Sequence, residues 1–161
     1  MGSKSMKRLV IRHAQSEANR TTRPAFGEAG AQLTKGGINQ CFNLGVVLIA
    51  MGVDRKDEAV AVSEKIRTQQ TARHVGFIWT EIYPILNEVS TNIPPLDLLV
   101  QLHKGQLPFE AIARAESILD DPPEERIWIT HGLVIAGLRE VLGMRSEPLV
   151  PGFCEVEEMT I

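Results

Sequence analysis

The sequence contains few cysteines: only Cys41 and Cys154, which lie far apart and form no C-x-x-C pair. A chain of 161 residues that is 43% hydrophobic can bury a sizeable core without covalent crosslinks, so a disulfide scaffold is not needed. Free cysteines usually behave as small apolar residues, and we expect both to lie in the core.

Excess positive charge and long apolar runs are also lacking. With a formal net charge of −3, the chain has no overall cationic field for nucleic acid or an anionic membrane, so any anion site must be local. No apolar run approaches the roughly 20 residues of a membrane-spanning helix, and the opening residues lack the apolar core of a secretory signal. These absences favour a cytoplasmic protein, whereas the oligomeric state leaves no trace in the sequence.

Internal repeats, low-complexity tracts and long linkers are absent as well. The length corresponds to one domain spanning residues 1–161, at roughly 150 residues per domain. Residues 1–5 precede a second methionine, Met6, and are expected to be a disordered or cloning-derived tail.

Short apolar runs alternate with amphipathic segments along the chain. Strands are expected at 7–12, 59–63, 126–130 and 153–161, and Pro84 reduces 81–86 to an edge strand or loop because proline cannot donate to a sheet. Helices are expected at 34–52, 65–75, 96–103, 108–119 and 132–142. This alternation predicts an α/β fold, a three-layer α/β/α sandwich with a mainly parallel central sheet.

The helix expected at 34–52 has apolar residues at helical spacing. Its predicted buried face includes Phe42 and Ile49 together with Cys41 and Leu48, and Asn39 lies opposite.

Three of the expected strands end on polar residues. The first ends on Arg12 and His13, the second on Ser63 with Arg67 one turn later, and the third on Thr130, His131 and Gly132. The carboxyl ends of parallel strands lie at one edge of a sheet, where helix N-termini near residues 64 and 132 add N–H groups that favour an anion. Each residue alone is typical of a solvated surface or a satisfied core, but their convergence predicts a phosphate pocket.

Four segments resemble the histidine phosphatase superfamily, the phosphoglycerate mutase-like proteins. Residues 9–19 (LVIRHAQSEAN) resemble its Arg-His-Gly signature, and 33–40 (LTKGGINQ) resemble its L-T-x-x-G-x-x-Q helix start. Residues 63–72 (SEKIRTQQTA) resemble its S-x-x-x-R-T-x-Q-T-A segment, and 129–132 (ITHG) its second-histidine motif. The motifs occur in the family's order along the chain. Ala14 departs from the family's frequent glycine and is tolerated only where φ is negative.

The resemblance implies a metal-independent phosphatase without a cofactor. His13 would be the nucleophile that forms a phosphohistidine, and Arg12, Arg67 and His131 would contact the oxygens of the transferring phosphoryl group. Glu88 is the best positional match for the acid that protonates the leaving oxygen, although a solvated loop glutamate would read the same way.

Ser16, Asn19 and Gly132 match positions that line the family's phosphate pocket, but Ser16 and Asn19 are equally typical of a polar loop. His74 and His103 follow no strand and are expected to be structural or exposed.

The segment 90–120 is expected to be a reduced cap, where larger relatives carry a substantial one. A small cap leaves the site open, which favours hydrolysis of a phosphate monoester or phosphoramidate on a small molecule or a phosphoprotein. Two alternatives are mutase-type phosphoryl transfer and a binding module that kept the anion pocket but lost turnover.

Overall fold

A computed structural model describes residues 5–19 and 31–161. The tail expected at 1–5 therefore lies almost wholly outside the described residues. The strands are β1 (Lys7–Arg12), β2 (Val60–Val62), β3 (Thr80–Ile82), β4 (Ile127–Thr130) and β5 (Val156–Thr160). The helices are α1 (Lys35–Ala50), α2 (Ile66–Val75), α3 (Pro95–His103), α4 (Phe109–Asp120) and α5 (Gly132–Val141), with short 3₁₀ helices η1 (Glu17–Asn19) and η2 (Pro84–Leu86).

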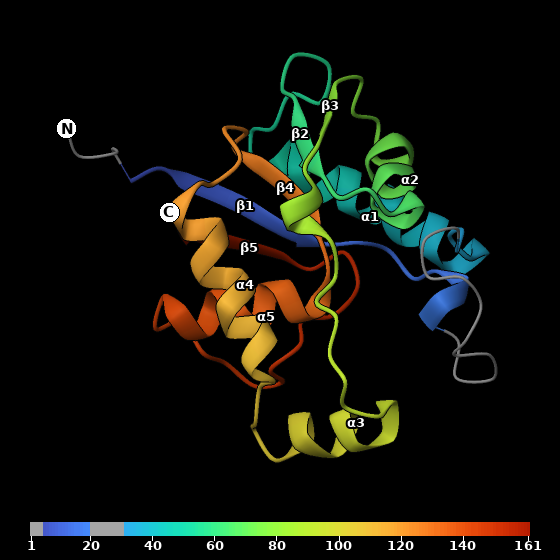
Figure 1. Ribbon diagram of the computed structural model, residues 1–161. Coiled ribbons are helices and arrows are strands. Elements are labelled where there is room, and N and C mark those ends of the chain that lie inside the picture. Colours follow the sequence, from blue (N-terminus) through green and yellow to red (C-terminus); the bar gives the residue numbers. More distant parts are fainter. Residues whose placement is uncertain (1–4, 20–30) are drawn as a thin grey trace.

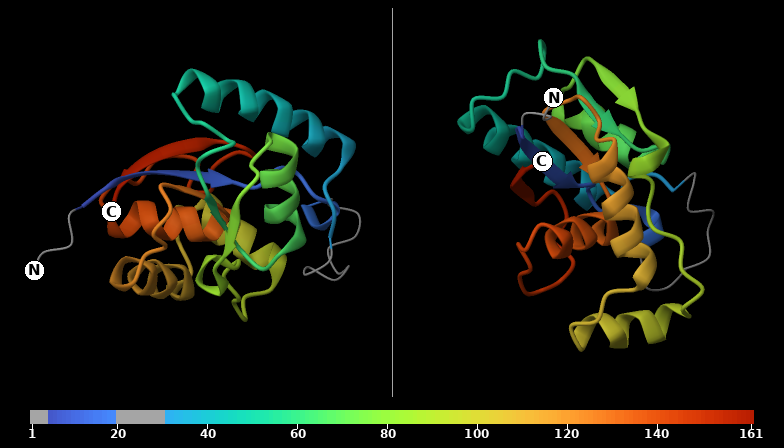
Figure 2. Two further views of the ribbon diagram at one scale, coloured as in Figure 1. Left: turned by 90° about the horizontal axis from the view of Figure 1, so that it is seen from above. Right: turned by 60° about the vertical axis from the view of Figure 1, so that its left-hand side comes forward.

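The strands form one sheet in the order β3-β2-β4-β1-β5, in which only β5 runs antiparallel to its neighbour. The sheet lies between α1 on one side and α4 and α5 on the other, as the left view of Figure 2 shows. This is the three-layer α/β/α arrangement with a mainly parallel sheet that the sequence predicts. β3 ends just before Pro84 and occupies an edge of the sheet, as proline requires.

Alternate residues of β1 enter different cores, because side chains along a strand point to opposite faces. Leu9 and Ile11 pack with the residues of α1 and α2, whereas Val10 packs with Trp128 and the residues of α4 and α5. Both faces of the inner strands are therefore covered by helices, which explains the continuous apolar run in β1.

α1 begins where the sequence predicts, with the Thr34 hydroxyl accepting a hydrogen bond from the Gly37 N–H at 2.9 Å. Its buried face was only partly predicted. Cys41 and Leu48 are buried, but Phe42 and Ile49 are 61% and 57% exposed, so the expectation for these two residues was wrong. Apolar residues lie around more than half of the circumference of α1, so their periodicity alone does not determine which of them face the sheet.

The segment expected to be a cap, 90–120, divides in two. α4 buries Ala111, Ala115 and Ile118 against α5 and belongs to the outer layer. α3 has no fully buried residue and lies at the margin of the molecule (Figure 1), where its half-buried Leu98 and Leu102 pack against the core of the α4–α5 layer. α4 is therefore not part of a cap. It packs closely on α5 because it presents small residues, Ala111 and Ala115, at i, i+4 spacing.

The two cysteines are free thiols, Cys41 buried and Cys154 half-buried. Cys154 is the one non-glycine residue at positive φ (57°) in the described part of the chain. Ala14 therefore has the negative φ that the sequence requires of it, and it lies fully buried in the core.

No helix within residues 5–19 and 31–161 is long and apolar enough to cross a membrane.

Candidate active site

Sheet register brings the two histidines together. β1 and β4 are parallel neighbours in which Arg12 pairs with Thr130, so the next residues, His13 and His131, leave the sheet side by side. Their ring centroids are 5.1 Å apart with the planes at 63°, close to the spacing of neighbouring strands. Both side chains are buried.

His13 has a defined tautomer. Its Nδ1 lies 2.7 Å from the carbonyl oxygen of Ala14, which can only accept, so Nδ1 carries the proton. Nε2 consequently keeps its lone pair. Burial, reinforced by the nearby Arg67 and Arg12 charges, lowers the pKa of His13 from 6.5 to about 3, so the ring stays neutral at physiological pH.

Arg67 projects into the same place from α2, with its Nε donating to His13 Nε2 at 3.3 Å. The side chain is 3% exposed, although the sequence alone is typical of a surface helix residue. A guanidinium held beside an unprotonated Nε2 is placed to contact an anion that reaches this atom.

His131 is held by the end of β2. The Ser63 hydroxyl lies 2.9 Å from His131 Nε2, and Ser63 follows Val62, which pairs with Ile129 in the neighbouring strand. His131 Nδ1 is buried and has no hydrogen-bond partner among the described residues. Desolvation by burial lowers the pKa of His131, with the His13 and arginine charges adding to the effect.

Arg12 completes the cationic side of the site. Its Nη1 donates to the carbonyl of Pro151 at 2.6 Å, and its guanidinium lies over the Phe153 ring at 4.1 Å. Its Nε is buried and has no partner among the residues described. Within the described residues, the buried Arg12 Nε–H has no acceptor, and it shares the site with Arg67 and the buried, unpartnered Nδ1 of His131, which is an arrangement that an anion site requires.

Gly132 shapes the floor beside Arg12. A Cβ at this position would lie 2.5 Å from Val150 and 3.3 Å from Arg12 Nε, so only glycine fits without a shift of Val150. Because Gly132 is the first residue of α5, its neighbourhood also carries the positive end of a helix.

Glu88 lies at the same site rather than in open solvent. The loop that carries it is tied to β4 by the Thr130 hydroxyl, which donates to Leu86 O at 2.7 Å, and to α4 by Arg114, which donates to Asn87 O at 2.6 Å. Burial raises the pKa of Glu88, while the Val89 N–H and the Arg67 and Arg12 charges partly offset the rise. A half-buried carboxyl with a raised pKa can hold a proton near an anion.

Residues 9–92 match the histidine phosphatase superfamily (branch 1), which is just over half of the chain. The chain belongs to the histidine phosphatase superfamily. No curated protein matches the chain in sequence.

Solved structures share its fold. A candidate α-ribazole-5'-P phosphatase from Escherichia coli K-12 is 25% identical, with a TM-score of 0.60 over 90% of this chain and 84% of that one. The protein TTHB049 from Thermus thermophilus is 20% identical, with a TM-score of 0.70 over 95% and 92%. The mycobacterial glucosyl-3-phosphoglycerate phosphatase, solved with VO3, is 17% identical, with a TM-score of 0.64 over 94% and 91%.

Ser16 and Asn19 form hydrogen bonds with each other. The Asn19 side-chain oxygen accepts from both the Ser16 N–H (3.0 Å) and the Ser16 hydroxyl (2.9 Å). This is the turn interaction typical of a polar loop. Neither residue lines the cavity that Arg12, Glu88 and Gly132 line, and the same is true of His13, Arg67 and His131.

Sequence reasoning missed Phe153 and Thr71. The Phe153 ring packs 6.0 Å from the His13 ring and under Arg12, and the Thr71 hydroxyl accepts from Ala14 N at 3.0 Å, fixing the backbone beside His13. Thr71 belongs to the segment 63–72 and could have been found by its helical spacing of four from Arg67. Phe153 lies in a loop that no motif marks.

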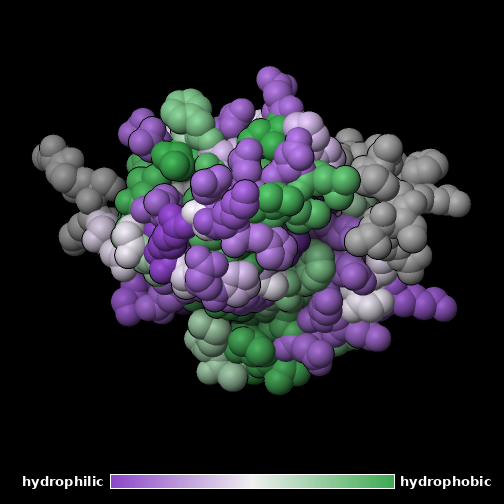
Figure 3. Space-filling view, turned by 90° about the horizontal axis from the view of Figure 1, so that it is seen from below, coloured by the Kyte–Doolittle hydropathy of each residue, from purple (hydrophilic) through white to green (hydrophobic). Residues whose placement is uncertain are grey.

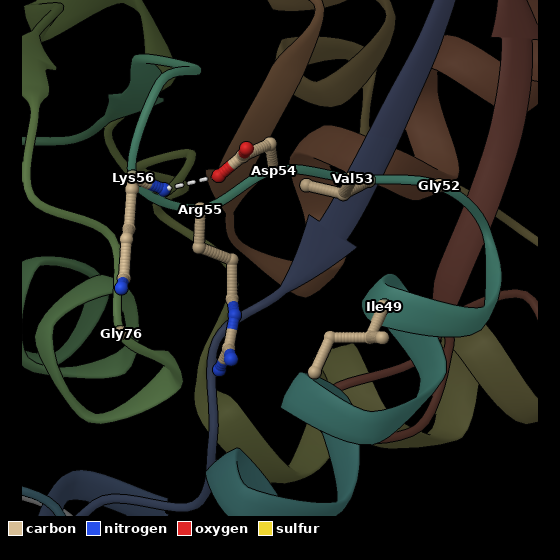
Figure 4. A pocket seen from close by; sticks show the side chains of 7 residues that line it. All are labelled: Ile49, Gly52, Val53, Asp54, Arg55, Lys56 and Gly76. Carbon is tan, nitrogen blue, oxygen red and sulfur yellow. Dashed lines mark hydrogen bonds between the residues drawn. The ribbon is translucent and has the colours of Figure 1, made fainter.

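A second cavity, of about 320 Å³, lies where α1 and α2 end, away from the candidate site (Figure 4). It holds Arg55, whose guanidinium donates to the Val75 carbonyl at the end of α2. None of the candidate site residues lines this cavity. Within residues 5–19 and 31–161, no group of three or more His, Cys, Asp or Glu side chains is arranged to hold a metal ion.

The low pKa of His13 has a measurable effect on stability. The unfolded chain takes up a proton at His13 below a pH of about 6.5, whereas the folded chain does so only near 3, so stability is lost as the pH falls between these values. Because of His13, we expect the free energy of unfolding to be about 2 kcal/mol lower at pH 5 than at pH 7.

Urea unfolding at pH 7 and pH 5, in buffer free of phosphate and sulfate, measures this cost. The loss of unfolding free energy should be smaller by about 2 kcal/mol in His13→Gln than in the unmodified chain. Equal losses in the two proteins would show that His13 is not held neutral.

Proposed function

We propose that this protein hydrolyses phosphate monoesters or phosphoramidates through a phosphohistidine on His13, without a metal or cofactor. The observation that carries the proposal is the neutral His13 Nε2 lying beside Arg67, in a site that also holds the buried Arg12 Nε–H and His131 Nδ1, neither of which has a partner among the described residues. The substrate would be a phosphorylated small molecule or a phosphoprotein.

In the first step, the Nε2 lone pair forms a bond to phosphorus while the bond from phosphorus to the leaving oxygen or nitrogen breaks. Glu88 gives its proton to the leaving atom, and Arg12, Arg67 and His131 stabilise the charge on the phosphoryl oxygens. In the second step, the Glu88 carboxylate takes a proton from water, the water oxygen bonds to phosphorus, and the N–P bond breaks. Phosphate leaves, and His13 returns to its neutral form.

Steady-state hydrolysis of p-nitrophenyl phosphate between pH 5 and 8 tests the proposal, together with trapping of a labelled enzyme. The expected result is turnover with an alkali-stable, acid-labile phosphoenzyme. Because His13 stays neutral, kcat/KM should not fall toward pH 5 with the pKa of an ordinary histidine.

Two other outcomes contradict it. Isomerisation of 3-phosphoglycerate in place of hydrolysis would identify a mutase. Stabilisation by orthophosphate with no turnover and no phosphoenzyme would identify a binding module.

A further inference from the structure

A cavity of about 440 Å³ opens directly from the candidate active site. Arg12, Glu88 and Gly132 line the end where the phosphoryl group would lie. The volume is in the range of small-molecule pockets, about 300–1,000 Å³. The remaining wall comes from α3, α5 and the loop after α5 and consists of Leu99, Leu102, His103, Leu133, Glu147, Pro148, Leu149 and Val150.

Apolar side chains dominate this wall. Leu99 and Leu102 enter it from α3, and Leu149 from the loop across the cavity. Leu99 is 54% exposed, whereas Leu102 is half-buried and packs against the core, and Figure 3 shows hydrophobic residues at the surface of the face on which α3 lies. Apolar area of this kind favours an apolar organic group, at about 25 cal/mol for each Å² removed from water.

Two residues that carry acceptors, Glu147 and His103, belong to the part of the wall formed by α3 and the loop after α5, which we call the far end of the cavity. Glu147 is exposed, and its carboxylate has no hydrogen bond or ion pair within the described residues. His103 donates from Nδ1 to the Leu99 carbonyl at 2.9 Å within α3, so its Nε2 is left as an acceptor.

Cations are lacking at that end. Among the described residues, the cavity is lined by one arginine, Arg12, which lies at the phosphoryl end, and by no lysine. Arg145 is near Glu147, but its guanidinium bonds the Glu140 carboxylate at 3.2 Å and the Gly105 carbonyl, and it does not line the cavity. A second anionic group on a substrate would face Glu147, while the nearby Arg145 is already bonded to the Glu140 carboxylate.

We infer that the preferred substrate is a phosphate ester whose organic part is apolar and ends in an amine, with Glu147 as the residue that selects the amine. The inference rests on the proposed function. It disfavours esters that carry a second carboxylate or phosphate at the far end.

The test compares kcat/KM for aryl phosphates that differ in one substituent, 4-(aminomethyl)phenyl, 4-methylphenyl and 4-carboxyphenyl phosphate. The aminomethyl ester should be the best of the three and the carboxy ester the poorest. Leaving-group reactivity also differs among the three esters, so the decisive quantity is the aminomethyl-to-methyl ratio in Glu147→Gln against the same ratio in the unmodified enzyme.

Glu147→Gln is expected to lower the aminomethyl-to-methyl ratio about five-fold, as for one solvent-accessible charge pair. Glu116→Gln, on the exposed side of α4, is the matched control and should leave the ratio unchanged. If Glu147→Gln still hydrolyses the methyl ester and its aminomethyl-to-methyl ratio is unchanged, the inference is overturned. Failure to hydrolyse any of the three esters would instead contradict the proposed function.

The apolar wall is tested separately with 2-naphthyl and phenyl phosphate. Leu102→Ser should lower the naphthyl-to-phenyl ratio of kcat/KM about ten-fold, since a hydroxyl replaces part of the apolar wall. Leu96→Ser changes the same helix at a position that does not line the cavity and should leave the ratio as it is. Equal ratios in the two variants would show that the organic group lies elsewhere.

Discussion

Replacement of His13 by alanine is expected to lower kcat by at least about 10⁴-fold, as for other enzymes that lose their nucleophile. Such a large loss is expected because His13 Nε2 is an unprotonated ring nitrogen in contact with Arg67. Within the described residues, no other side chain is shown in this position. The measurement is hydrolysis of p-nitrophenyl phosphate, with trapping of the phosphoenzyme in parallel.

Two variants keep this result interpretable. His13→Gln preserves a polar side chain of similar size and should be as inactive as His13→Ala while unfolding at a similar temperature. His74→Ala removes a half-buried histidine of α2 that has no contact with the candidate site in the structure, and it should retain activity. Substantial turnover in folded His13→Gln, or a phosphoenzyme formed without His13, would refute the nucleophile.

Replacement of Glu88 by glutamine is expected to lower kcat/KM about 10²- to 10⁴-fold for phenyl phosphate, whose leaving group needs a proton. For p-nitrophenyl phosphate the loss should be only a few-fold, because p-nitrophenolate leaves without one. The raised pKa of Glu88 supports this role, since a carboxyl that is desolvated beside the site retains its proton more readily.

The leaving-group dependence separates an acid from a residue that only shapes the site. Glu64→Gln provides a control, because Glu64 is an exposed acid bonded to Asn87, next to Glu88 in the loop. Its effect should be small and the same for both esters. If Glu88→Gln also affects both esters equally, Glu88 does not transfer the proton.

Much of the layer structure could be predicted because β1 and β4 carry uninterrupted apolar runs and α1 carries a capping threonine. Parallel pairing then explains why residues as distant in sequence as His13 and His131 meet, since each follows the last paired residue of its strand. Arg12 and Arg67 meet for the same reason. Arg12 ends β1 and Arg67 follows the end of β2, and the carboxyl ends of these parallel strands lie at one edge of the sheet.

What periodicity could not supply was which apolar positions face inward. Phe42 and Ile49 have the spacing of a core face but point to solvent, and α4 reads like a cap yet packs on α5. Phe153, Glu147 and the other residues beyond α5 lie in an irregular loop, where contacts depend on tertiary structure rather than on a local repeat.

α3 contributes no fully buried side chain, yet two of its leucines face the cavity. Substitutions at the exposed positions of this helix therefore carry little penalty for folding, unlike those at Leu98 and Leu102, which pack against the core. Changes in Arg12, Arg67 or the strands that hold the histidines disturb the buried scaffold. Under the proposed function, the α3 wall of the cavity and the reacting groups belong to separate parts of the chain. Exchange of exposed residues within 95–103 is therefore expected to change ligand preference while the reacting groups stay as they are.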